Sequence, residues 1–245
     1  MDGISYKNWL EYRAGLKKDP SLMVYYTFED KAVAGMASVA NNSGKKDAGN
    51  YDGKVKNPVW TEGRWKEKKA MSFDDNWLEA IPYNIENKAF TCEMWIRKNG
   101  SGSQKGNNDY KNGTIIGVSG WSTGWRITTT CEIPNGVIHF ALGGPTSKPQ
   151  VNSKPVSDGE WHLLTAVWDG KKLSLYIDGD LSAERDYSED YTPVPASADA
   201  KHEWLRIGYA DLGVGSVKMD VDEVAIYNRA LSADEIKKHR FMTIK

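Results

Sequence analysis

The sequence predicts an all-β protein in which two antiparallel sheets pack face to face as a sandwich. Between Ala70 and Ile177, short strand-forming runs rich in β-branched and aromatic residues alternate with turn-forming residues, which is the pattern of a sandwich. The same segment has no heptad repeat and no long helical pattern. Sandwiches of this size, 245 residues, are commonly single domains, and a chain of this length can bury a substantial core.

The longest predicted strand lies near the end of the chain. Val217, Met219 and Val221 alternate with charged residues, as expected of a strand with one buried face. The apolar residues then change phase, and Val224 and Ile226 continue the alternation. The charged residues at this phase change are therefore expected to be held at a fixed place in the sheet.

A short helix is expected directly after this strand. Ser232 supplies an N-cap oxygen, and Glu235, three residues later, completes a capping box. Leu231 before the cap and Ile236 after it are placed to form a hydrophobic staple. The helix therefore closes the end of the strand.

A second helix is predicted between Ser5 and Lys17, where apolar residues recur at helical spacing. Asp19-Pro20 ends it, because the residue before a proline is disfavoured in a helix. We interpret residues 1–20 as a helical extension that lies on the sandwich or links it to a preceding segment, and residues 21–245 as the β-domain. A partner-binding helix is the alternative.

Three long polar segments, rich in Gly, Asn, Ser or Pro, are predicted to be surface loops. They are Ala32–Gly53, Ser101–Gly113 and Tyr187–His202. Loops of this length in a compact domain are usually functional or disordered.

Composition and charge argue against several classes of function. Lys and Arg total 32 against 33 Asp and Glu, a net charge of −1, so there is no basic field to gather nucleic acid or an anionic membrane. No apolar run approaches the ~20 residues that cross a bilayer. The polar start of the chain lacks the apolar region of a signal peptide, which by itself indicates a cytoplasmic protein.

The two cysteines leave two interpretations open. Cys92 and Cys131 both lie in predicted strands and lack the C-x-x-C spacing of a zinc or redox site. They either form a disulfide between neighbouring strands in an oxidising compartment or are buried free thiols.

Several segments follow one another in a recognisable order. The segment DEVAIYNRALSADEI begins at Asp222. Earlier segments are LMVYYTFED (Leu22–Asp30), DGKV (Asp52–Val55), AMSFDDNWLEAI (Ala70–Ile81), AFTCEMWIRK (Ala89–Lys98), DGEWHLLTAVWDGKKLSLYIDGD (Asp158–Asp180) and LRIGYA (Leu205–Ala210). Together they resemble the laminin-G-like, concanavalin-type jelly-roll family. The resemblance implies a two-sheet antiparallel jelly roll with a short helix at each end of the chain, working outside the cell as a fragment of a longer exported protein.

The resemblance also implies a structural Ca²⁺ ion. Matched position by position, its ligands would come from Glu29 after the first strand, the loop around Asn42, and Asp222 of the closing segment. Calcium takes six to eight oxygen ligands, which carboxylates and loop carbonyls supply. Alternative ligands are Asp30, Asp52 and Asp220. In the other interpretation, Glu29 and Asp222 are solvated carboxylates or pair with Lys45 and Lys46.

A catalytic site is not indicated. Endoglucanases with this jelly roll carry two carboxylates on one strand in an E-x-D-x-x-E run, which gives the ~5 Å spacing of retaining glycosidases. The nearest approach is MDVDEV at Met219–Val224, and Glu93 stands alone in TCEMWI. The histidines lack a nucleophile motif such as G-x-S-x-G. We therefore predict that the protein is not an enzyme.

The candidate binding residues are aromatic. The chain has 10 Trp and 12 Tyr, and sugar rings stack their apolar faces on flat aromatic rings. Residues in family-like strands are expected to pack between the sheets instead: Trp95, Trp161, Trp168, Tyr176 and Tyr227. The carbohydrate-binding candidates are Trp121, Trp125, Tyr110 and Tyr191. Trp121 is flanked by Gly120 and Ser122 and is the best candidate for exposure, whereas Trp125 alternatively opens a strand. Hydrogen bonds to the ligand would come from Asn107, Asn108, Asp109 and Arg126.

We predict a non-catalytic recognition module that binds carbohydrate, with a glycan or glycoprotein as its partner, in a larger surface or secreted protein. A protein-adhesion or assembly module is the first alternative. A glycan hydrolase or lyase with an unfamiliar site is the second. Neither nucleic-acid binding nor membrane insertion is expected.

Overall fold

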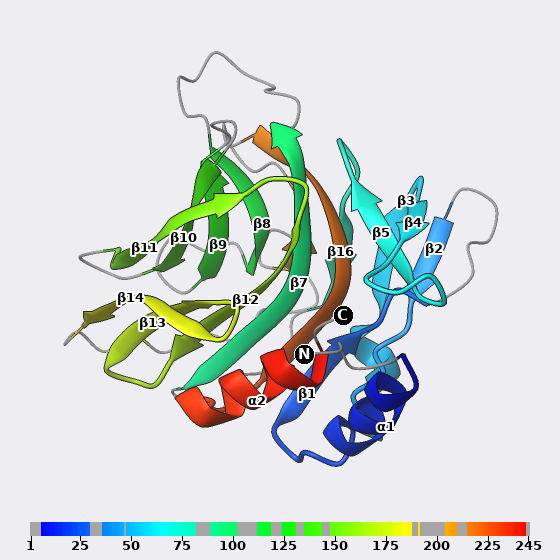
Figure 1. Cartoon of the computed structure of the whole chain (residues 1–245), viewed down its shortest axis with the longest axis horizontal. Coiled ribbons are helices and arrows are strands. Elements are labelled where there is room, and N and C mark those ends of the chain that lie inside the picture. The colour runs from blue at the N-terminus through cyan, green and yellow to red at the C-terminus, as the bar shows by residue number, and fades with distance from the viewer. Residues whose placement is uncertain are drawn as a thin grey trace.

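Two antiparallel sheets, A and B, pack face to face in a jelly-roll sandwich, as the sequence predicts (Figure 1). The structure is a computed structural model of the chain. It describes residues 6–29, 36–46, 48–81, 89–101, 112–118, 124–130, 135–143, 148–187, 191, 204–209 and 215–243. The two sheets are joined where the start of one long strand, β16, pairs in parallel with β8.

Sheet A runs in the order β14-β13-β12-β7-β16, and β1 and β5 share the other edge of β16, with β4 beyond β5. Its strands are β1 (Leu22–Tyr26), β4 (Val59–Glu62), β5 (Lys69–Phe73), β7 (Phe90–Ser101), β12 (Trp161–Trp168), β13 (Lys172–Ile177), β14 (Asp180–Asp186) and β16 (Gly215–Tyr227). The helices are α1 (Tyr6–Leu16), α2 (Ala233–Thr243) and the 3-10 turn η1 (Ala48–Tyr51).

Sheet B runs in the order β11-β10-β9-β8-β15-β6-β3-β2. Its strands are β2 (Met36–Val39), β3 (Gly53–Lys56), β6 (Leu78–Ala80), β8 (Asn112–Val118), β9 (Trp125–Thr130), β10 (Asn135–Leu142), β11 (Gln150–Ser157) and β15 (Leu205–Ile207). The segment Ala32–Gly53, predicted as one long loop, thus contains an edge strand and a helical turn. Strand β2 is only four residues long, which is too short for a clear alternation.

The core lies between the sheets and is built from inward-facing residues of both. Phe90 on β7, Phe140 on β10 and Ile226 on β16 are fully buried, and complete burial of such a side chain contributes about 1.5–3 kcal/mol. Cys92 belongs to this core as a free thiol, whereas Cys131 lies outside the described residues. The two sheets thus share one core.

Strand β16 runs through the middle of sheet A, with β7 on one side and β5 and β1 on the other (Figure 1). Its register against β7 shifts between Val221 and Glu223. This β-bulge is the physical cause of the phase change in the sequence, because one extra residue lets both Val221 and Val224 face the core. The extra residue is Asp222.

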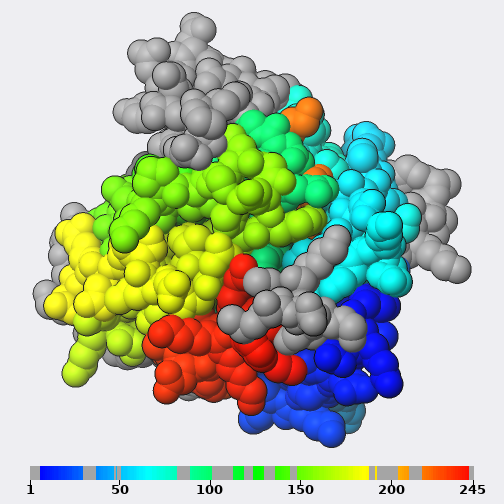
Figure 2. Space-filling view, in the orientation of Figure 1, coloured from blue at the N-terminus to red at the C-terminus, as the bar shows by residue number. Residues whose placement is uncertain are grey.

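Both helices lie on the outer face of sheet A. The N-terminal and C-terminal segments, blue and red in Figure 2, lie next to each other on the surface. Trp9 of α1 and Ile236 of α2 are fully buried, and Ile236 packs with Tyr25 and Tyr227 on that face of the sheet. In the described chain, neither helix has the length and apolarity needed to cross a bilayer.

Four of the five aromatic residues expected between the sheets lie on the outer face of sheet A instead. Trp168 is in the inter-sheet core, but Tyr176 and Tyr227 pack in the cluster beneath α2. The guanidinium of Arg240 on α2 lies 4.9 Å from the Trp95 ring. Trp161 is on the same face of sheet A as Trp95, because Leu163, two residues along β12, is opposite Trp95. The prediction was wrong because alternation marks a buried position without indicating what buries it.

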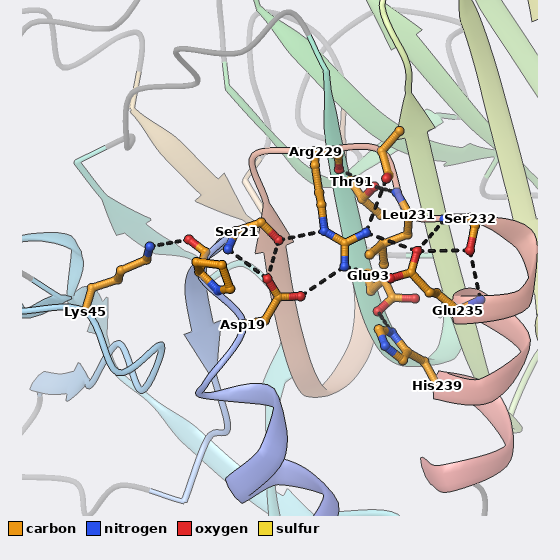
Figure 3. A network of polar contacts seen from close by, with 12 residues as sticks. Asp19, Ser21, Lys45, Thr91, Glu93, Arg229, Leu231, Ser232, Glu235 and His239 are labelled. Atoms are coloured by element: carbon orange, nitrogen blue, oxygen red, sulfur yellow. Dashed lines mark hydrogen bonds and ion pairs between the residues drawn. The ribbon is translucent and has the colours of Figure 1, made fainter.

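The predicted capping box and hydrophobic staple of α2 are confirmed (Figure 3). The Glu235 amide donates to Ser232 Oγ at 3.3 Å, and the Ser232 amide donates to Glu235 Oε2 at 2.8 Å. Leu231 and Ile236 belong to one buried cluster. Arg229 donates to Glu235 Oε1 at 2.8 Å and to Asp19 Oδ2 at 3.0 Å. These contacts tie the end of the chain to the turn after α1, and hydrogen bonds from Arg229 hold the pKa of Glu235 at about 2.

We expect Ser232→Ala to lower the free energy of unfolding by about 1 kcal/mol, because the amide of Glu235 loses its capping acceptor. Urea unfolding of the wild type and the variant measures the difference. Lys237→Ala, at an exposed position inside α2, is the control and should change stability by less than about 0.5 kcal/mol. Equal effects of the two substitutions would contradict the capping role.

Candidate functional site

The three residues predicted to bind calcium each contact other protein groups. Glu29 forms an ion pair with Arg13 and accepts a hydrogen bond from Tyr6 Oη at 3.1 Å. Asn42 donates from its side-chain amide to the Ala40 carbonyl at 3.0 Å. Asp222 is fully buried in the sandwich. The two carboxylates therefore have separate partners in the protein.

Lys68 supplies the positive charge next to Asp222. Its ammonium lies 2.5 Å from Asp222 Oδ1 and donates to the carbonyls of Thr27 and Asp222, both at 2.8 Å, and of Lys69 at 3.3 Å. The Lys68 side chain is 0 % exposed. Carbonyl and carboxylate oxygens from β5, from β16 and from the residue after β1 thus surround an ammonium group much as they would surround a hard metal cation.

Arg64 completes the surroundings of Asp222. Its backbone amide donates to Asp222 Oδ2 at 2.7 Å, and its guanidinium lies 3.4 Å from Oδ1 and pairs with Glu223. Gly63 leaves room for this carboxylate, because a Cβ there would lie 2.7 Å from Oδ2. Burial alone would raise the pKa of Asp222, but the charges of Lys68 and Arg64 and their hydrogen bonds hold it below its ordinary value.

This arrangement does not fit a calcium ion at Asp222. A divalent cation would lie beside the Lys68 ammonium in a fully buried space, where repulsion between like charges is strong. Of the alternative ligands, Asp220 pairs with Arg97, and Asp52 accepts from the Asn41 amide; Asp30 lies outside the described residues. The described ranges contain no group of three or more acidic, His or Cys residues that could hold a metal. Calcium binding stays a prediction of the sequence.

We expect Lys68→Met to lower the free energy of unfolding by about 3–5 kcal/mol, because it leaves the buried Asp222 carboxylate without its closest cation. Urea unfolding measures the loss. Lys69→Met, with an exposed side chain, is the matched control. The loss should become much smaller when Asp222 is also replaced by Asn, and an equal loss in both backgrounds would show that the two groups do not interact.

The outer face of sheet A also buries two glutamates under the helices. Glu93 and Glu223 line a cavity of about 30 Å³ together with Tyr12 and His239. Trp9 Nε1 donates to Glu223 at 3.0 Å, and the other described partners of the two carboxylates are Tyr25, Arg64, Thr165 and His239. Glu93 therefore has hydrogen-bond partners inside the fold, although it has no second carboxylate next to it in TCEMWI.

The contact between His239 and Glu93 predicts a pH dependence of stability. Burial would lower the pKa of His239, but the Glu93 carboxylate, 2.7 Å from Nδ1, raises it above its ordinary value. A histidine whose pKa is raised by folding stabilises fully below its unfolded pKa of about 6.5, and the contribution is lost as pH rises through the folded pKa.

We therefore expect His239→Gln to destabilise the protein most at acidic pH, near 5.5, with a difference from the wild type that shrinks as the solution becomes alkaline. Urea unfolding between about pH 5.5 and pH 9 measures it. His139→Gln, on sheet B, is the control. A difference that grew with pH would contradict the assigned pair.

Two of the predicted carbohydrate-binding aromatics are buried. Trp125 is 2 % exposed, with its ring centroid 5.2 Å from that of Phe90 in the core. Tyr191 is 3 % exposed and donates to the Gly124 carbonyl at 3.0 Å. Neither ring has a free face for a sugar, because both are packed in the core between the sheets. Arg126, predicted to donate hydrogen bonds to the ligand, is exposed on β9. The other candidates lie outside the described residues: Trp121, Tyr110, Asn107, Asn108 and Asp109.

The structure places an exposed aromatic pair elsewhere, on sheet B. Trp77 is 38 % exposed, and its ring centroid lies 5.1 Å from that of Tyr209 in an edge-to-face contact. The guanidinium of Arg206 lies 4.4 Å from the Tyr209 ring centroid. Leu78, the first residue of β6, is in the core, whereas Trp77 directly before it is exposed to solvent. The sequence prediction missed this pair because both residues lie in family-like strand segments.

The family of the chain follows from its sequence. A family model described as the concanavalin A-like lectin/glucanases superfamily (Laminin_G_3) matches residues 74–237. The chain belongs to this superfamily. No curated protein sequence matches it.

Three solved structures have a similar fold. The binding domain of Paraclostridial Mosquitocidal Protein 1 has a TM-score of 0.68 and 16% identity, over 92% of this chain and 52% of that one. The binding domain of Botulinum Neurotoxin DC in complex with SialylT has a TM-score of 0.62 and 15% identity, over 90% and 50%. The same domain in complex with rat synaptotagmin II gives 0.63 and 16%, over 90% and 51%. The chain thus spans about half the length of each.

Proposed function

We propose that the protein is a non-catalytic carbohydrate-binding module. The observation that carries this proposal is the exposed Trp77–Tyr209 pair on the outer face of sheet B, with the Arg206 guanidinium against it. Flat rings with adjoining hydrogen-bond donors match the apolar faces and hydroxyl groups of a sugar. The two described helices lie on sheet A and leave this pair accessible.

The comparisons support a carbohydrate ligand. The superfamily of this chain is named for lectins and glucanases, and one domain of similar fold has been solved with SialylT. As the family resemblance implies, we propose that the module is part of a larger surface or secreted protein.

Burial of the acidic residues supports a module without catalysis. Glu93 and Glu223 lie beneath the helices and accept hydrogen bonds from surrounding side chains. A glycosidase needs one carboxylic acid and one carboxylate on either side of an accessible sugar bond. The carboxylates of Glu93 and Glu223 instead accept hydrogen bonds from side chains inside the fold.

A protein-adhesion module is the second candidate. A domain of similar fold has been solved with rat synaptotagmin II, which supports protein binding as the alternative. The structural calcium ion implied by the family resemblance stays part of the proposal, with a binding position away from the Asp222 carboxylate that Lys68 and Arg64 surround.

A glycan array tests the proposal. We expect the wild-type protein to bind a subset of glycans. Trp77→Ala should lose most of that binding, because the apolar face of the sugar then has no indole ring to stack on. Phe241→Ala, which removes another exposed aromatic ring from α2, is the matched control and should bind like the wild type.

Absence of binding to any glycan would overturn the carbohydrate proposal and favour the adhesion module. Glycan binding that survives Trp77→Ala would place the site elsewhere on the chain. Turnover of a polysaccharide by the wild-type protein would contradict the absence of catalysis.

A further inference from the structure

A row of residues crosses the outer face of sheet B next to the aromatic pair. Residues opposite each other in antiparallel strands share a face, and the register gives the row Lys54, Glu79, Arg206, Gly117, Arg126, Ala141 and Gln150. The inward neighbours of this row belong to the core, among them Val55, Leu78 and Ile127. The row therefore lies on the outer surface of the sandwich.

This row is positively charged in a protein whose total charge is −1. It carries three cationic side chains, Lys54, Arg206 and Arg126, against the single carboxylate of Glu79. Lys56 is exposed on the same side of β3. Positive charge gathered on one face attracts an anionic ligand, and the attraction weakens as salt is added.

The two arginines lie on either side of a residue without a side chain. Gly117 is opposite Arg206 on β15 and opposite Arg126 on β9. A Cβ at this position would lie 2.6 Å from the Trp125 carbonyl and 2.9 Å from Cβ of Arg126, so a larger residue does not fit. With strands about 4.8 Å apart, the arginine Cα atoms are roughly 10 Å apart across the glycine.

Small residues flank Arg126 on both sides. Gly117 lies on one side, and Ala141 lies on the other. The Arg126 side chain is exposed and is not covered by its cross-strand neighbours. An exposed guanidinium with small neighbours can donate two parallel hydrogen bonds to the carboxylate of a ligand.

Arg206 joins this charged row to the aromatic pair. Its guanidinium lies over Tyr209, whose ring contacts Trp77. Beyond Ala141, the face continues with polar side chains of β10 and β11, in which Asn152 Oδ1 contacts His139 Nδ1 at 2.8 Å and Gln150 Nε2 at 2.7 Å. Aromatic rings, cations and amides thus follow one another across a single face.

We propose that the outer face of sheet B binds a carboxylated sugar. Arg126 and Arg206 bind the carboxylate above Gly117, and the Trp77–Tyr209 pair stacks against the sugar rings. The proposal rests on the proposed carbohydrate-binding function and adds the chemical class of the ligand. Charge complementarity selects this class over a neutral glycan.

The test compares sialylated glycans with the same glycans after removal of the sialic acid. We expect the wild-type protein to bind the sialylated form about tenfold or more tightly, because hydrogen bonds from arginine to a carboxylate are stronger than those between neutral groups. Arg126→Gln should reduce this preference severalfold, because only Arg206 is then left to bind the carboxylate. Lys238→Gln, an exposed charge on α2, removes the same charge elsewhere and should keep the preference.

The outcomes separate this inference from the function on which it rests. Equal binding of the two forms by the wild type would overturn the carboxylate site and leave the glycan-binding function intact. The carboxylate site would also be overturned if Arg126→Gln preferred the sialylated form as strongly as the wild type does. Binding of neither form would overturn the function itself. Circular dichroism and melting of Arg126→Gln check that the fold is kept.

Discussion

The fold of sheet A depends on the buried contact between Asp222 and the cations of Lys68 and Arg64. Asp222 is the extra residue of the β-bulge in β16, where β5 ends its pairing and β1 begins. The Lys68 ammonium binds backbone oxygens from all three of these strands or their ends. Removing either charge would leave the other uncompensated in the interior, which is far costlier than loss of an exposed pair.

The same bulge also shapes the outer face of sheet A. Glu223, directly after the bulge, turns outward and accepts hydrogen bonds from Trp9 of α1 and Tyr25 of β1, so the helix packs on sheet A. Helix α2 covers the rest of that face through Leu231 and Ile236. The described helices leave the outer face of sheet B uncovered, and there Trp77 is exposed and the arginines of β9 and β15 share one face.

The sequence predicted the features that local chemistry determines. The phase change after Val221 marks the bulge, and the residues from Leu231 to Ile236 specify the cap and staple of α2. The partners of Asp222 were not predictable, because Lys68 is 154 residues away and no short motif links them. Exposure of Trp77 was missed for a related reason. The strand pattern around it is the same as that of buried tryptophans, and only the positions of the helices decide which faces are covered.

A crystal structure of the protein grown in calcium tests the central physical claim most directly. Our account predicts that the Lys68 ammonium remains among the carbonyls of Thr27, Lys69 and Asp222, without anomalous scattering from calcium at that position. A calcium ion bound to Asp222, with Lys68 displaced toward solvent, would contradict it.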